Sequence, residues 1–131
     1  MLKGGCVYNQ RMFSFNFEKL DVWQEAIQFA DAIYRITKKF PEYERFGLTS
    51  QMRRAAVSIS SNIAEGSSRL SRTDFARFVE IATGSLFEVI SQTRIAINQR
   101  FLSQADYEQI AAAAEKQCRM LSGLRKSLGK G

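Results

Sequence analysis

The stretch that decides the fold is QMRRAAVSISSNIAEG, residues 51–66. Its apolar side chains recur every three or four residues, which is the spacing of one face of an α-helix. This inward face consists of Leu48, Met52, Ala55, Ile59 and Ile63. The pattern predicts a helix over about 49–65, with Thr49 as its N-cap and Gly66 as the residue just beyond its C-terminus.

The same helical period recurs in three further windows, over about 21–39, 72–99 and 104–128. Pro41 ends the first window, while Ser71 and Ser103 are placed to cap the other two. The inward faces predicted for these windows are Val22, Trp23, Ala26, Ile27, Ala30, Ile33 and Tyr34; then Phe75, Phe78, Val79, Ala82, Leu86, Val89 and Ile97; then Tyr107, Ile110, Ala111, Ala114, Cys118, Leu121 and Leu128. Because β-type alternation is absent and the connections are short, we expect an all-α fold, an antiparallel up-down-up-down four-helix bundle.

Composition and length fit one ordinary domain: 131 residues, of which 45% are hydrophobic and 24% charged. We expect the bundle domain over 17–128, a flexible extension over 1–16 and a frayed C-terminus over 129–131. No apolar run reaches the roughly 18 to 20 residues that span a bilayer, and the N-terminus does not resemble a signal peptide. We therefore expect a cytoplasmic protein without membrane contact.

Several kinds of catalytic site are excluded by residues that the chain lacks. The sequence has no histidine, which removes Ser-His-Asp and Cys-His nucleophiles, and it has no glycine-rich phosphate loop. Cys6 and Cys118 fit no metal-ligand spacing, so neither a metal nor a cofactor is expected. A carboxylate enzyme using Glu65 and Glu88 is the remaining catalytic alternative, and we favour a protein that is not an enzyme.

Beside its apolar face, the 51–66 helix carries a second stripe that is polar, and the third helix repeats this pattern. The stripes consist of Gln51, Arg54, Ser58, Asn62 and Glu65, and of Ser85, Glu88 and Gln92. They are either solvated surfaces or a polar network between helices or subunits.

Two observations favour a shared, buried helix. Arg53 lies near the N-terminus and Glu65 near the C-terminus, opposite to what the helix dipole prefers. Ala56, Ser60 and Ala64 form a row of small residues where another helix could approach closely. We therefore predict self-association into a homo-oligomer.

The formal net charge of +6 and a pI near 9.6 suggest a polyanionic partner, RNA or DNA. The residues predicted to contact phosphate are Arg53, Arg54, Arg69, Arg72, Arg77, Arg119, Arg125 and Lys126. The alternative for the C-terminal members is a solvated tail. Because Phe75 and Phe78 fall on the core face, we expect backbone contacts without recognition of bases.

Residues 51–66 resemble the hallmark segment of the four-helix bundle family also called 23S rRNA intervening-sequence proteins. Further matching residues extend the resemblance over about 17–121, while 97–101 depart from the family pattern. These further matches are Phe17, Leu20, Val22, Trp23, Ala26, Phe40, Pro41, Phe46, Gly47, Leu48, Phe75, Phe78, Ile81, Ala82, Gly84, Ser85, Leu86 and Glu88.

The resemblance implies a ring-like homopentamer with a basic surface that binds RNA or DNA and has no catalytic activity. The positions that match the family's polar signature are Arg54, Ser58, Asn62, Glu65, Ser85 and Glu88. We interpret them first as residues of an interhelical or intersubunit network and second as ligand contacts. A related set of proteins implies an alternative function, an accessory protein of a diversity-generating retroelement that binds a reverse transcriptase and its template RNA.

Overall fold

The computed structural model describes residues 15–129, and this part of the chain contains helices and no β-strand. Four α-helices are joined by short connections, as the periodicity predicts. Among residues 15–129, no helix has both the length and the apolar character needed to cross a membrane. The elements are η1 (Asn16–Lys19), α2 (Asp21–Thr37), η2 (Glu42–Glu44), α3 (Leu48–Ser67), α4 (Arg72–Asn98) and α5 (Gln104–Ser127).

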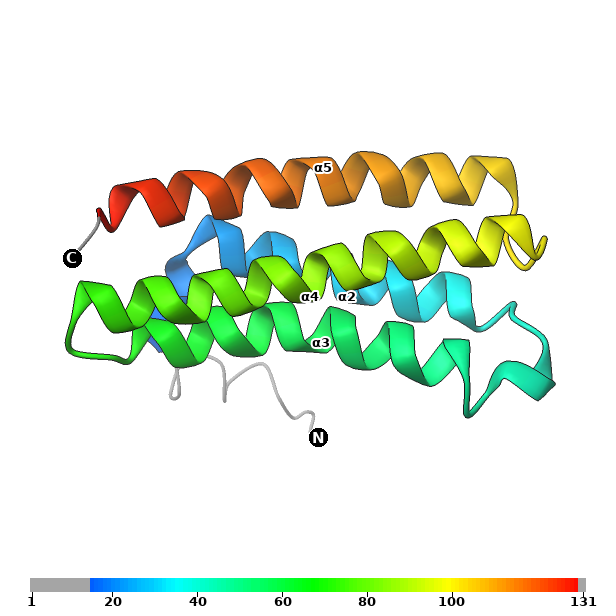
Figure 1. The fold of residues 1–131 in the computed structure, drawn as a ribbon, viewed down its shortest axis with the longest axis horizontal. Coiled ribbons are helices and arrows are strands. Elements are labelled where there is room, and N and C mark those ends of the chain that lie inside the picture. Colours follow the sequence, from blue (N-terminus) through cyan, green and yellow to red (C-terminus); the bar gives the residue numbers. More distant parts are fainter. Residues whose placement is uncertain (1–14, 130–131) are drawn as a thin grey trace, which may run out of the picture.

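The four α-helices lie side by side along the long axis of the molecule (Figure 1). The connections after α2 and α4 lie at one end, and the connection between α3 and α4 lies at the other. The largest interface joins α3 and α4, while α2 packs against both α3 and α5. Helix α3 is therefore covered on two sides by its own chain. Of the extension predicted over 1–16, all but Phe15 and Asn16 lies outside the described residues.

Local capping signals are confirmed for α4 and α5. The Ser71 hydroxyl accepts a hydrogen bond from the Asp74 amide at 3.0 Å, and the Ser103 hydroxyl accepts one from the Asp106 amide at 3.1 Å. The N-cap predicted for α3 is wrong, because the helix begins at Leu48 and Thr49 is buried in its first turn. The Glu44 carboxylate takes the capping role from outside the helix, accepting from the Leu48 amide at 2.9 Å.

The prediction that Gly66 follows the C-terminus of α3 is wrong. Gly66 is a buried residue within the last turn of the helix. A Cβ added there would meet the Cβ of Phe78 at 2.7 Å and the Cδ1 of Phe75 at 2.9 Å. Glycine is therefore required by the close approach of α4 and not by a left-handed backbone.

The buried core follows the predicted faces closely, with two corrections. Tyr34 is 41% exposed and Ala111 is exposed, so neither belongs to the core. Phe29 and Ile36 are buried instead, because the inward face of α2 is centred on Ala26 and Ile33.

Helix α5 buries a polar residue that periodicity did not single out. Gln117 is fully buried, and its Nε2 donates to the Val22 carbonyl of α2 at 3.3 Å. Its Oε1 has no hydrogen-bond partner among the described residues.

Replacing Gly66 with alanine is expected to lower the free energy of unfolding by about 1 to 3 kcal/mol, because the new methyl group overpacks the contact with Phe78. The matched control is Gly123→Ala in α5, where no heavy atom lies within 4 Å of the added Cβ. That change should raise the free energy of unfolding by about 0.5 to 1 kcal/mol. Urea denaturation followed by circular dichroism measures both, and equal effects would contradict the close approach.

Candidate functional site

The polar stripe of α3 faces the polar stripe of α4. The hydroxyls of Ser58 and Ser85 lie 2.9 Å apart and share a hydrogen bond across the two helices. Asn62 donates to the Ser58 carbonyl at 2.8 Å and to its hydroxyl at 3.0 Å. The three side chains therefore form a polar network at the largest helix interface of the molecule.

Ser58 of this network also lines a hollow of about 370 Å³, which we call the α3–α4 groove. Gln92 contributes a buried Oε1 atom that has no hydrogen-bond partner among the described residues. The groove brings together five residues of the two predicted polar stripes, namely Gln51, Arg54, Ser58, Glu88 and Gln92. Its lining consists of Phe46, Ser50, Gln51, Arg54, Ala55, Ser58, Glu88 and Gln92.

The row of small residues on α3 requires a correction. Ala56 and Ser60 are buried within the single chain. On the same side of α3, the Arg53 Nε donates to the Thr37 hydroxyl of α2 at 2.8 Å. This side therefore packs toward α2, and the row is explained by contacts within the chain instead of contacts between subunits.

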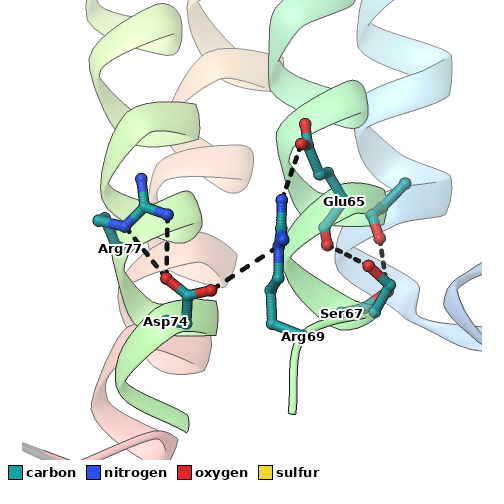
Figure 2. A network of polar contacts seen from close by, with 7 residues as sticks. Glu65, Ser67, Arg69, Asp74 and Arg77 are labelled. Atoms are coloured by element: carbon teal, nitrogen blue, oxygen red, sulfur yellow. Dashed lines mark hydrogen bonds and ion pairs between the residues drawn. The ribbon is translucent and has the colours of Figure 1, made fainter. Parts of the chain in front are cut away.

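At the turn between α3 and α4, arginines and carboxylates form a compact network (Figure 2). Arg69 lies 3.0 Å from the Glu65 carboxylate and 3.8 Å from that of Asp74. Arg77 donates twice to one oxygen of Asp74, at 3.2 and 2.9 Å. Both guanidinium groups also lie over the Phe78 ring, at 4.7 and 4.6 Å from its centroid. Two positive charges are thus matched by two negative charges, which also gives Glu65 a partner at the unfavourable end of its helix.

Other predicted phosphate contacts also have roles within the chain. Arg72 donates to the carbonyls of Ser127 and Leu128, so it caps the C-terminus of α5. Arg125 lies 2.7 Å from the Glu80 carboxylate and also donates to the Gly129 carbonyl at 2.7 Å. Arg53 is held by α2, as described above. Arginine count alone therefore overstates the charge that is available to a partner.

The remaining predicted contacts are more accessible. Arg119 makes an exposed ion pair with Glu115 at 3.6 Å, which is a weak restraint. Arg54 and Lys126 are exposed and make no ion pair within residues 15–129. The structure therefore distinguishes accessible cations from those that hold the bundle together.

Sequence reasoning missed a second hollow, of about 530 Å³, which shares Phe46, Ser50 and Arg54 with the α3–α4 groove. We call it the Phe46 hollow, after a side chain that is 86% exposed. The sequence contains one signal for this hollow. Phe46 is a large apolar residue in the connection before α3, where no helical face can bury it. Its lining consists of Tyr34, Arg45, Phe46, Thr49, Ser50, Arg53, Arg54 and Val57.

Comparison with known proteins identifies a family and a similar solved structure. The family model described as 23S rRNA-intervening sequence protein matches residues 18–123, which include both hollows and the α3–α4 turn. A crystal structure at 1.70 Å, of a protein with unknown function from the S23 ribosomal protein family from Bacteroides thetaiotaomicron VPI-5482, is similar with a TM-score of 0.72. The similarity is 25% identity and covers 80% of this chain and 98% of that chain. No curated protein matches.

We predict that the Ser58–Ser85 hydrogen bond contributes to the free energy of unfolding. Ser58→Ala and Ser85→Ala should each lower it, while the double variant loses less than the sum, with a coupling of about 0.5 to 1.5 kcal/mol. Denaturant titration of the four proteins measures this coupling. Ser61→Ala, at an exposed position of α3, is the control and should show no coupling to Ser85→Ala. Strict additivity of the Ser58 and Ser85 variants would contradict the interhelical bond.

Proposed function

The chain belongs to the 23S rRNA-intervening sequence protein family, and we propose that it is a basic, non-enzymatic homo-oligomer that binds RNA or DNA. In this proposal the four helices run antiparallel in up-down-up-down order, and copies of the bundle close into the pentameric ring that the resemblance implies. The nucleic acid is contacted mainly through its phosphates.

The observation that carries the proposal is positive charge that the chain does not neutralise. Within residues 15–129, nine of the sixteen basic side chains and six of the thirteen acidic ones make no ion pair, which leaves an excess of positive charge. Arg53 and Arg72 are held by hydrogen bonds within the chain, whereas others, such as Arg54, are accessible and support attraction of a polyanion. Half of the formal charge of +6 belongs to Lys3, Arg11 and Lys130, which lie outside the described residues. The nine are Lys19, Arg35, Lys38, Arg53, Arg54, Arg72, Arg94, Arg100 and Lys126.

Self-association is supported by an outward face of α4 that carries large apolar side chains. Ile81 is 42% exposed and Phe87 is 55% exposed. Gly84 lies midway between them in the sequence, and no heavy atom lies within 4 Å of a Cβ added there. An apolar surface with such a notch suits the close approach of a helix from a second copy.

A catalytic role forms no part of the proposal. Glu65 is engaged by Arg69, and the chain has no histidine to act with Glu88.

The second candidate is the accessory protein of a diversity-generating retroelement. The same face of α4 favours it, because the exposed Ile81 and Phe87 could contact a reverse transcriptase instead of a second copy. Co-purification from the native cell, followed by mass spectrometry and sequencing of bound RNA, separates the two candidates. A recovered reverse transcriptase supports the accessory role, and its absence beside bound nucleic acid supports the first proposal.

Binding to a labelled nucleic acid should weaken steeply with salt, with log K falling by roughly 0.7 to 0.9 per phosphate contacted for each tenfold rise in salt. Arg54→Gln should flatten this slope, because an accessible phosphate contact is lost. Fluorescence anisotropy at several salt concentrations measures the slope. Lys116→Gln is the matched control, since it removes the same charge from a side chain already paired with Glu25 at 3.2 Å. A salt-independent response of the unmodified protein would overturn the proposal.

Gly84→Gln is expected to shift the protein toward smaller assemblies while keeping its helical content. Glutamine favours the helix more than glycine does, but its side chain fills the notch on α4. Gly123→Gln, at a similarly open position in α5, should leave the mass unchanged. Light scattering coupled to size-exclusion chromatography gives the mass of each variant. An unaltered mass for Gly84→Gln would exclude this face as the subunit contact.

A further inference from the structure

The Phe46 hollow places two exposed aromatic rings beside arginines. The Arg45 guanidinium lies 5.3 Å from the centroid of the Phe46 ring, which is 86% exposed. The Arg53 guanidinium lies 4.7 Å from the centroid of the Tyr34 ring, which is 41% exposed. Each ring is thus supported by a cation and keeps surface open to solvent.

The connection that carries Phe46 is held in place by hydrogen bonds. The Gly47 amide donates to the Glu44 carbonyl at 3.0 Å, and the Leu48 amide donates to the Glu44 carboxylate at 2.9 Å. A Cβ at Gly47 would lie 2.8 Å from that carboxylate, so glycine permits this arrangement. The exposed ring is therefore presented from a defined turn.

The charge around the hollow is positive. Three arginines line it, and among the described residues none of its lining side chains is acidic. Within residues 15–129, Arg45 pairs only with Glu42, at 3.3 Å, and both partners are largely exposed. Arg53 donates to neutral oxygens of α2, and Arg54 makes no ion pair within residues 15–129. The surface therefore combines aromatic faces with cations that a polyanion can engage.

We propose that the Phe46 hollow binds single-stranded nucleic acid, with unpaired bases stacked on Phe46 and Tyr34 and phosphates held by Arg54. This inference rests on the proposed nucleic-acid binding and adds the class of substrate. In a duplex the base faces are already stacked inside the helix, whereas a single strand offers them to aromatic side chains. The hollow, of about 530 Å³, is open to solvent, so a flexible strand can lay its bases against the exposed rings while its backbone stays at the surface.

The test measures binding of the full chain to four labelled probes by fluorescence anisotropy. The probes are a 12-nucleotide oligouridine, a 12-nucleotide oligothymidine DNA, an abasic strand of the same length, and a 12-base-pair duplex. The unmodified protein should bind both base-containing single strands more tightly than the abasic strand. Comparison of the oligouridine and oligothymidine probes shows whether the hollow binds RNA or DNA more tightly.

Phe46→Leu removes the aromatic face but keeps an apolar side chain, and it should weaken oligouridine binding by about fivefold or more. Its affinity for the abasic strand and the duplex should not change, and Phe46→Trp should restore the single-strand affinity. Tyr43→Leu is the matched control, because Tyr43 is 79% exposed in η2 but does not line the hollow. Since Phe46 contributes little to the core, circular dichroism should show the same helical content in all variants.

Three results for Phe46→Leu would overturn the inference, and a fourth, for the unmodified protein, would reject the proposed function. Equal loss of oligouridine, abasic and duplex binding in Phe46→Leu would show a contact that does not depend on bases. A lower oligomer mass for Phe46→Leu in light scattering would assign the hollow to a subunit interface. Unchanged oligouridine binding would remove Phe46 from the nucleic-acid surface while leaving the proposed function intact, whereas failure of the unmodified protein to bind any probe would reject the proposed function itself.

Discussion

The close packing of α3 against α4 is the constraint on which the rest of the molecule depends. At one end, Gly66 lets the backbone of α3 approach the side chains of Phe75 and Phe78 on α4. Near the middle, the hydroxyls of Ser58 and Ser85 meet at 2.9 Å. Small and polar residues at this interface keep the helices near each other, and the longer side chains on either side form the rim of the α3–α4 groove. The α3–α4 groove therefore arises directly from the close packing of these two helices.

The distribution of charge follows a similar logic. Arginines near the start of α4 and the C-terminus of α5 stabilise the fold. They donate hydrogen bonds to carbonyls or pair with carboxylates. Planar guanidinium groups suit this use because they bridge several acceptors at once. Among the cations left over, Arg54 lies near the start of α3 and lines both hollows. Contacts within the chain thus leave fewer arginines open to a partner than the composition suggests.

The sequence predicts what depends on neighbours along the chain and misses what depends on neighbours in space. Helical periodicity and the Ser71 and Ser103 caps are local, and the structure confirms them. Thr49 and Gly66 were misassigned because a carboxylate from a preceding turn and a ring from α4 decide their surroundings. The polar stripes of α3 and α4 can be identified in the sequence, but only the fold shows that they contact each other. The Phe46 hollow joins α2 to the start of α3, and no single helical projection contains it.

Gln117 has a further consequence, which concerns alignment. The facing surfaces of α2 and α5 are largely aliphatic, and such surfaces tolerate sliding because one apolar contact is much like another. The bond from the Gln117 amide to the Val22 carbonyl ties α5 to the first turn of α2, and a slide by part of a turn would leave this amide without a partner in the core. A single buried amide among aliphatic side chains thus restrains how α5 can slide along α2, a restraint that apolar packing by itself does not supply.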